Sequence, residues 1–234
     1  MNRRDVLRGA SLATLTGLAG CTGVLGGSGG TSTPNTYLPR PSDQKAKSEN
    51  LVYPAWGQQF PTSTLPAVFH DGSVTMPGDF SGKNFFAVWF YSHCPTVCPV
   101  EISDMRSLQT KALQASYDTR FVAATFNPTQ DTKSRLKAYA KEKYVNLNAG
   151  DWYFLRPTSE KAAKPIATGK YGIKFGKSYE QNGTQYYHHG AIIFLVNGNG
   201  HVERTYHSSL NHKVQWQPMW KDLKALRKKE GKSV

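Results

Sequence analysis

The sequence predicts an α/β fold in which a central mixed β-sheet is flanked by helices, and three features support this. Residues 85–91 (FFAVWFY) form a continuous apolar run, which is typical of a strand buried on both faces of a parallel sheet. Residues 186–196 rise into the apolar run AIIFLV, and the turn sequence NGNG separates them from a partner strand at 201–207, which predicts a hairpin. Apolar residues at helical spacing follow residue 98 and return between about 212 and 229.

The remaining elements fall between these features. Residues 119–126 (TRFVAATF) predict a second parallel strand, and Asp131 is expected to cap the helix that follows it. Residues 151–155 (DWYFL) predict a short third strand, and residues 159–168 predict a further helix. This order is a thioredoxin-like arrangement with insertions. The apolar face of the last helix is expected to carry Val214, Trp216, Met219, Trp220, Leu223 and Leu226.

The first 21 residues resemble an export signal that ends in a lipid attachment site. Arg3 and Arg4 resemble a twin-arginine signal, and the apolar stretch 9–20 is too short to span a bilayer, which needs about 20 helical residues. The sequence LAGC ending at Cys21 resembles a lipobox, in which the cysteine becomes the lipidated first residue of the mature protein. We therefore expect lipidation at Cys21 and a position on the extracytoplasmic face of the cell membrane.

Composition divides the rest of the chain into two parts. Gly, Ser, Thr and Pro dominate after Cys21, so we expect a flexible tether over residues 22–49 and a folded domain over residues 50–230. The formal net charge is +13, and it is 13 − 2 = +11 once the residues before Cys21 are removed. Such a surface suits an anionic membrane or an acidic protein, and nucleic acid is the least expected partner because no nucleic-acid motif is present and the chain is expected to be exported.

Cys94 and Cys98, in YSHCPTVCPV, have three candidate uses: a structural disulfide, a redox pair or part of a metal site. A disulfide across so short a loop would constrain the unfolded chain little. Pro99 suits the first helical position, so we expect Cys98 to be the N-cap residue, outside the helix, where the helix dipole favours a thiolate. The helical face that follows is expected to contain Ile102, Met105, Leu108, Ala112 and Leu113.

The three-residue spacing favours a metal site over the tighter CxxC pair of thioredoxins. Thiolates prefer soft ions such as cuprous copper, zinc or iron–sulfur centres, but two ligands rarely complete a site. His188 and His189 precede the buried strand AIIFLV, in a loop that faces the cysteines in a thioredoxin-like fold. Two sulfurs and one imidazole suit copper better than zinc, which usually requires a fourth ligand. Adjacent strand residues point to opposite faces, so only one of the two histidines is expected to bind.

These segments together resemble the Sco/SenC family, the membrane-attached copper proteins that help assemble the binuclear copper site of cytochrome c oxidase. The resemblance covers roughly residues 60–228. YSHCPTVCP is similar to the family's THCPxxCP, FNPTQDTKSRLKAYA at 126–140 to DPxRDTPxxLxxYA, DWYFL to WxFLTG, and HHGAIIFLVNGNG at 188–200 to DHSxxxYLxDxxG.

The resemblance implies copper, as Cu+ or Cu2+, held by Cys94, Cys98 and His189. His188 and Asn127 stand where the family usually has aspartates, so two carboxylates near the site are missing. Together with Asp131, these two residues are expected to surround the ligands and to influence copper affinity or redox potential.

Two functions remain open from the sequence. The first is a metallochaperone that delivers copper to the copper-site subunit of cytochrome c oxidase. The second is a thiol–disulfide oxidoreductase that keeps the cysteines of that site, or of other exported proteins, reduced. In this alternative Cys98 would be the attacking thiolate and Cys94 the resolving cysteine. The metallochaperone is the preferred interpretation, and enzymatic activity is left undecided.

Overall fold

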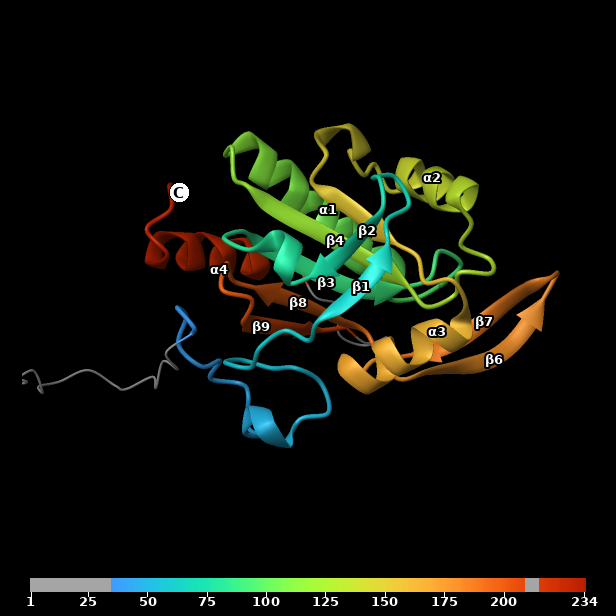
Figure 1. The fold of residues 1–234 in the computed structure, drawn as a ribbon, viewed down its shortest axis with the longest axis horizontal. Coiled ribbons are helices and arrows are strands. Elements are labelled where there is room, and N and C mark those ends of the chain that lie inside the picture. The colour runs from blue at the N-terminus through green and yellow to red at the C-terminus, as the bar shows by residue number, and fades with distance from the viewer. Residues whose placement is uncertain (1–34, 209–214) are drawn as a thin grey trace, which may run out of the picture.

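A computed structural model of the protein describes residues 35–208 and 215–234. Its centre is a five-stranded sheet in the order β5-β4-β3-β8-β9 (Figure 1). The strands are β3 (Asn84–Phe90), β4 (Thr119–Thr125), β5 (Trp152–Leu155), β8 (Ile192–Val196) and β9 (Val202–His207). β3 pairs in parallel with β4 and β4 with β5, whereas β8 is antiparallel to both β3 and β9. The predicted mixed sheet, the second parallel strand at 119–126 and the hairpin between AIIFLV and residues 201–207 are therefore confirmed.

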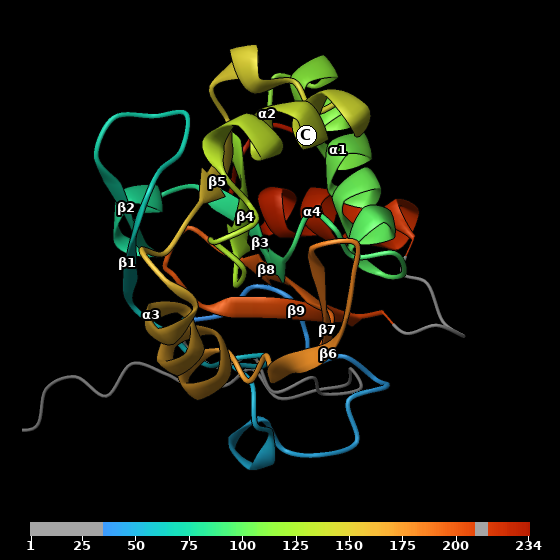
Figure 2. The ribbon, with the colours of Figure 1, turned by 90° about the vertical axis from the view of Figure 1, so that its right-hand side faces the viewer.

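Helices and a small hairpin cover the sheet. The helices are α1 (Cys98–Gln114), α2 (Lys133–Glu142), α3 (Glu160–Lys164), which continues into a π-helix (Pro165–Lys170), and α4 (Trp216–Lys229). Figure 2 shows α1 and α4 together on one side of the sheet. Because its two faces are both covered, every residue of β3 is buried, as the apolar run at 85–91 predicts.

The buried face of α1 is slightly narrower than predicted. Ile102, Met105, Leu108 and Ala112 are completely buried, but Leu113 is 40% exposed. A helix turns by about 100° per residue, so Leu113 lies one step beyond the stripe that faces the sheet. Of the last helix, Val214 lies outside the described residues, and Met219, Leu223 and Leu226 are buried as predicted.

Two hairpins were not predicted. β1 (Ser63–Pro66) pairs with β2 (Ser73–Met76), and β6 (Phe175–Gln181) pairs with β7 (Thr184–His189). The predicted strand AIIFLV is confirmed as β8, and the residues that lead into it belong to the separate strand β7, which ends at His189. β6 is exposed from Gly176 onward and has no apolar alternation, so periodicity could not reveal it. The turn at Asn182–Gly183, where both residues have positive φ, was the available sequence signal.

The folded domain also begins earlier than predicted. The Glu203 carboxylate accepts the backbone N–H groups of Tyr37 and Leu38 at 2.8 and 2.9 Å, and the Trp56 indole donates to the Leu38 carbonyl at 2.9 Å. Leu38 is only 2% exposed. The predicted tether boundary at residue 49 is therefore wrong, because the later part of that polar stretch satisfies its backbone against β9.

The predicted export signal, Cys21 and the first part of the tether lie outside the described residues. Within the described parts of the chain, no helix combines the length and the apolar character that crossing a membrane requires.

Candidate metal centre

Cys94 lies in the loop between β3 and α1, and Cys98 is the first residue of α1. β3 ends at Phe90, and α1 begins at Cys98 with Val97 as its N-cap. The Val97 carbonyl accepts the first helical hydrogen bonds, from the N–H groups of Val100 and Glu101 at 3.0 and 3.1 Å. The prediction that Cys98 is the N-cap and lies outside the helix is wrong by one residue. Proline is tolerated anywhere in the first turn, since no N–H is needed there, so Pro99 occupies the second helical position instead.

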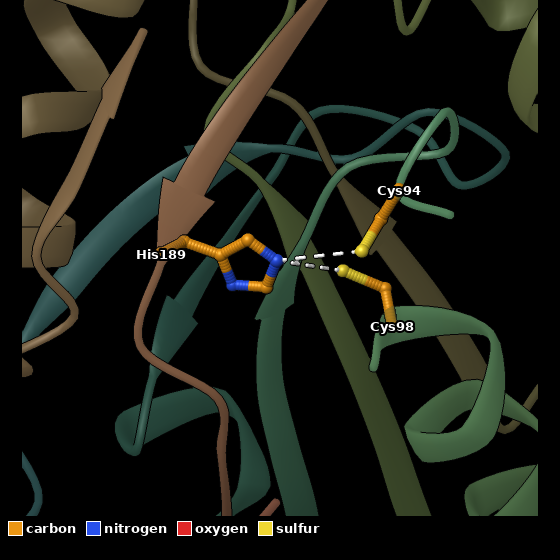
Figure 3. Close-up of side chains that lie close together, drawn as sticks. All are labelled: Cys94, Cys98 and His189. Atoms are coloured by element: carbon orange, nitrogen blue, oxygen red, sulfur yellow. Dashed lines mark hydrogen bonds between the residues drawn. The ribbon is translucent and has the colours of Figure 1, made fainter. Parts of the chain in front are cut away.

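The fold brings Cys94, Cys98 and His189 together (Figure 3). His189 Nε2 lies 3.5 Å from Cys94 Sγ and 3.2 Å from Cys98 Sγ. The three potential ligand atoms all lie within 4.8 Å of one another. Both cysteines are buried and neither is in a disulfide, whereas His189 is half-buried. The three residues predicted from the sequence therefore converge at one point.

The orientation of His189 is set by its other ring nitrogen. Nδ1 lies 2.9 Å from the Gly190 carbonyl oxygen, which can only accept, so Nδ1 carries the proton in this hydrogen bond. Nε2 is then the ring nitrogen that faces the two sulfurs. His188 is exposed and is not part of the cluster, in agreement with the alternation of side chains along β7.

Tyr91 connects the two halves of the site. Its hydroxyl accepts the Tyr187 backbone N–H at 3.2 Å, two residues before His189 on β7. Its carbonyl accepts the Cys94 N–H at 3.2 Å, and its ring meets the His189 ring edge to face at 5.6 Å. Tyr91 is thus in contact with both the cysteine loop and the histidine strand. The sequence indicated Tyr91 only as the last residue of an apolar strand.

The two thiols differ in acidity. A hydrogen bond from the Cys98 thiol, with a further contribution from His189, holds the pKa of Cys94 far below that of a free thiol. Burial raises the pKa of Cys98 well above its usual value, and the neighbouring Cys94 adds to this effect. The predicted thiolate at Cys98 is therefore wrong: complete burial outweighs the helix dipole, and Cys94 is the thiolate of the pair.

Asp131 anchors the start of the cysteine loop. Its buried carboxylate accepts the Ser92 N–H at 3.1 Å, the Ser92 hydroxyl at 2.5 Å and the Thr125 hydroxyl. The prediction that Asp131 caps a helix is wrong, because Thr132 is the N-cap of α2 and accepts the Arg135 N–H. Asp131 nevertheless supports the site, since it fixes the residue two positions before Cys94.

Two other buried polar residues lie in the neighbourhood of the ligands. Asn127 donates from Nδ2 to Gln130 Oε1 at 2.8 Å and is oriented by that contact rather than by the sulfurs. Glu101, which the sequence placed only in the first turn of a helix, is completely buried, and neither carboxylate oxygen has a hydrogen-bond partner among the described residues. Burial, with the charge of Cys94 second, raises its pKa well above the usual value.

A pocket of about 470 Å³ opens beside the site. Residues 95–97 of the cysteine loop form part of its wall, and residues 186–189 of β7 form another part. His189 belongs to this lining, so the pocket gives access to the ligand cluster.

The donor set fits copper. A thiolate, a second thiol that can lose its proton and an imidazole nitrogen are the ligands that cuprous and cupric copper accept in proteins. No fourth side chain joins the cluster among the described residues, which does not suit a closed structural zinc site.

The fold and the ligand cluster define a thioredoxin-like domain with two cysteines and a histidine in metal-binding geometry. The chain belongs to the SCO1/SenC family, whose model matches residues 62–224. It is 24% identical over 141 residues to the SCO1 protein homolog of Bacillus subtilis (strain 168), which covers 60% of this chain and 70% of that protein.

Solved structures of the family share the fold. A SCO1/SenC family lipoprotein from Bacillus anthracis str. Ames has a TM-score of 0.60 at 23% identity and covers 74% of this chain and 95% of its own. ScoI from Arabidopsis thaliana with copper bound has a TM-score of 0.57 at 19% identity, and the match covers 71% of this chain and 99% of that chain. BsSco has a TM-score of 0.57 at 19% identity, and the match covers 76% of this chain and 98% of that chain. BsSco has a disulfide switch and is a member of the Sco family of cytochrome c oxidase assembly proteins. At these identities the likeness shows the fold.

Proposed function

We propose that this protein binds copper at Cys94, Cys98 and His189 and delivers it to the binuclear copper site of cytochrome c oxidase. The observation that carries the proposal is the position of His189 Nε2, at 3.5 and 3.2 Å from two thiol sulfurs that are not joined to each other. Membership of the SCO1/SenC family supports it. So do a relative solved with copper bound and a relative assigned to cytochrome c oxidase assembly.

Cys94, Cys98 and His189 are suited to take up copper. Cys94 is already a thiolate, and Cys98 releases its proton when the ion arrives, since a metal competes with the proton for sulfur. His189 binds through Nε2, and the hydrogen bond from Nδ1–H to the Gly190 carbonyl holds the ring in this orientation. Release then requires an acceptor with ligands of similar softness that replaces these three in turn. Copper binding is therefore expected to need reduced cysteines.

We also propose that the protein is held at the extracytoplasmic face of the membrane by lipid on Cys21. The support is the sequence alone: the paired arginines, the short apolar stretch and LAGC ending at Cys21. Buried acyl methylenes contribute about 0.8 kcal/mol each, so more than one chain gives a stable anchor. Intact mass of membrane-extracted protein should begin at a modified Cys21, and a soluble product with an unmodified N-terminus would contradict this.

A thiol–disulfide oxidoreductase is the second candidate, and the unequal acidity of the two thiols favours it. The Cys94 thiolate would attack a partner disulfide, form a mixed disulfide and release one partner thiolate. Cys98 would then lose its proton and attack Cys94 Sγ, which forms the Cys94–Cys98 disulfide and releases the second partner thiolate. The partner gains the two electrons that the pair loses. The attacking and resolving roles are the reverse of those predicted from the sequence.

One comparison separates the two functions. The reduced protein, covering residues 35–234, and its His189→Ala variant are tested for copper stoichiometry and for reduction of a peptide disulfide. The copper function predicts one copper per chain in the wild type and loss or strong weakening in the variant. The proposal fails if the wild type binds no copper and both proteins reduce disulfides equally well.

A further inference from the structure

The pocket beside the metal centre contains a second imidazole that the three-ligand cluster does not use. His188 and His189 both line this pocket of about 470 Å³. The other polar side chains among its described lining residues are hydroxyl groups of Ser, Thr and Tyr, and oxygen ligands suit harder ions than copper. Apart from the cluster residue His189, His188 is therefore the lining side chain best suited to bind copper.

His188 is free to act as a ligand. Its side chain is exposed, and it lies opposite Gly176 in the β6–β7 pairing, where a glycine covers nothing. Even an added Cβ at Gly176 would meet no atom within 4 Å. Within the described parts of the chain, the His188 side chain makes no hydrogen bond, ion pair or ring contact. Both ring nitrogens are available, and the ring can turn without breaking any interaction.

His188 also lies on the side from which an ion can reach the cluster. Cys98 is completely buried and Cys94 is 5% exposed, whereas His189 is half-buried and lines the pocket. Of the three cluster residues, only His189 lines the pocket, so the pocket meets the cluster at His189. Adjacent residues on a strand point to opposite faces, so His188 cannot join the three ligands while the ion sits between the sulfurs. It can bind only an ion that is in transit.

We propose that His188 is a transient copper ligand at the mouth of this pocket, which holds the ion as it passes between an outside donor or acceptor and the Cys94–Cys98–His189 site. The inference rests on the proposed copper function. During release, a bond from copper to a His188 nitrogen forms as the bond to His189 Nε2 breaks, and ligands of the acceptor then replace the sulfurs. The ion remains Cu+ throughout, and the Cys98 sulfur recovers a proton from water. Uptake follows the same steps in reverse.

This role has a kinetic signature that a resident ligand lacks. A group that binds the ion only in passage lowers the barrier equally in both directions and leaves the equilibrium constant unchanged. A resident ligand stabilises the bound state, so its loss weakens affinity and speeds release. The ratio of the two rate constants therefore distinguishes a transit ligand from a fourth resident ligand.

The test follows Cu+ exchange between the purified full-length protein and the chromogenic bicinchoninate complex of Cu+ by stopped flow. Uptake is measured with apoprotein and release with loaded protein, and the affinity comes from equilibrium competition with the same chelator. The variants are His188→Asn, which removes the imidazole, and His188→Met, which supplies a soft thioether. His201→Asn is the matched control, since His201 lies outside the pocket lining.

We expect His188→Asn to slow uptake and release together by about tenfold, with an unchanged dissociation constant. His188→Met should recover much of the wild-type rate, and His201→Asn should match the wild type. Unchanged rates in His188→Asn would overturn the inference, and so would faster release with weaker affinity, which marks a resident ligand. A wild type that takes up no Cu+ would overturn the proposed function as well, whereas normal uptake with unaffected rates would overturn this inference alone.

Discussion

Replacing Tyr91 by phenylalanine tests whether a single hydroxyl sets the distance between the thiols and the histidine. The substitution removes the acceptor of the Tyr187 N–H, a hydrogen bond of 3.2 Å between residues that are 1% and 8% exposed. It retains the ring that packs on His189 at 5.6 Å. A buried donor left without a partner costs about 1–3 kcal/mol, so Tyr91→Phe should lower the free energy of unfolding by that amount.

Part of this loss should appear at the metal site, because Tyr187 lies two residues before His189 on the same strand. Removal of a group that orients a metal ligand typically lowers metal affinity by about 10- to 100-fold. We therefore expect the Cu+ affinity of Tyr91→Phe to be about tenfold lower than that of the wild type. Urea unfolding gives the stability, and chelator competition gives the affinity. The absorption of Cu2+ bound to thiolate reports the ligand geometry directly and should also shift.

Tyr187→Phe is the matched control, because it removes a buried tyrosine hydroxyl that contacts Glu160 at 3.0 Å rather than the backbone of β7. It should leave the copper spectrum unchanged. If Tyr91→Phe were destabilised but bound copper with wild-type affinity and an unchanged spectrum, Tyr91 would stabilise the fold without positioning His189, and the reasoning would be refuted.

Three buried carboxylates give further predictions. Asp131→Asn should destabilise the protein to urea by roughly 1.5–3 kcal/mol, because the amide cannot accept all the donors that the carboxylate holds; a change below about 0.5 kcal/mol would contradict its anchoring role. Burial raises the pKa of Glu101 well above 4.5, so the folded state keeps a proton that the unfolded state loses as pH rises. The free energy of unfolding should therefore fall by about 1.4 kcal/mol per pH unit between pH 4.5 and the folded pKa. Glu101→Gln should remove this slope from the pH dependence of urea unfolding. An identical slope in the variant would contradict the assignment of the slope to Glu101. Glu203→Gln should expose the Leu38 amide to hydrogen exchange, whereas retained protection would show that other contacts hold the segment.

Patterns with strong physical constraints were predictable from the sequence. The β3 strand is apolar at nearly every position because both faces of the sheet are covered, and such a run of seven residues is typical of a strand buried on both faces. The clustering of Cys94, Cys98 and His189 was predictable because the cysteines follow this strand and His189 lies just before the next buried one. The end of β3 and the start of β8 lie at the same edge of the sheet, so residues that are far apart in the sequence lie close together in the fold.

Features that depend on tertiary context were not predictable. The polar segment around Leu38 resembles a linker because its partner, the Glu203 carboxylate, is 165 residues away. β6 is exposed and has no apolar period, so only its turn indicated a hairpin. The acidity of Cys98 was predicted from its helix position, but complete burial was the larger effect, and burial is a property of the folded chain.

The coordination of copper tests the central claim most directly. X-ray absorption of the copper-loaded protein should show two sulfur ligands and one imidazole nitrogen on each copper ion, contributed by Cys94, Cys98 and His189. In His189→Ala the imidazole contribution should disappear while both sulfurs remain. An imidazole signal that persists in His189→Ala, or a wild-type site with fewer than two sulfurs, would contradict the account.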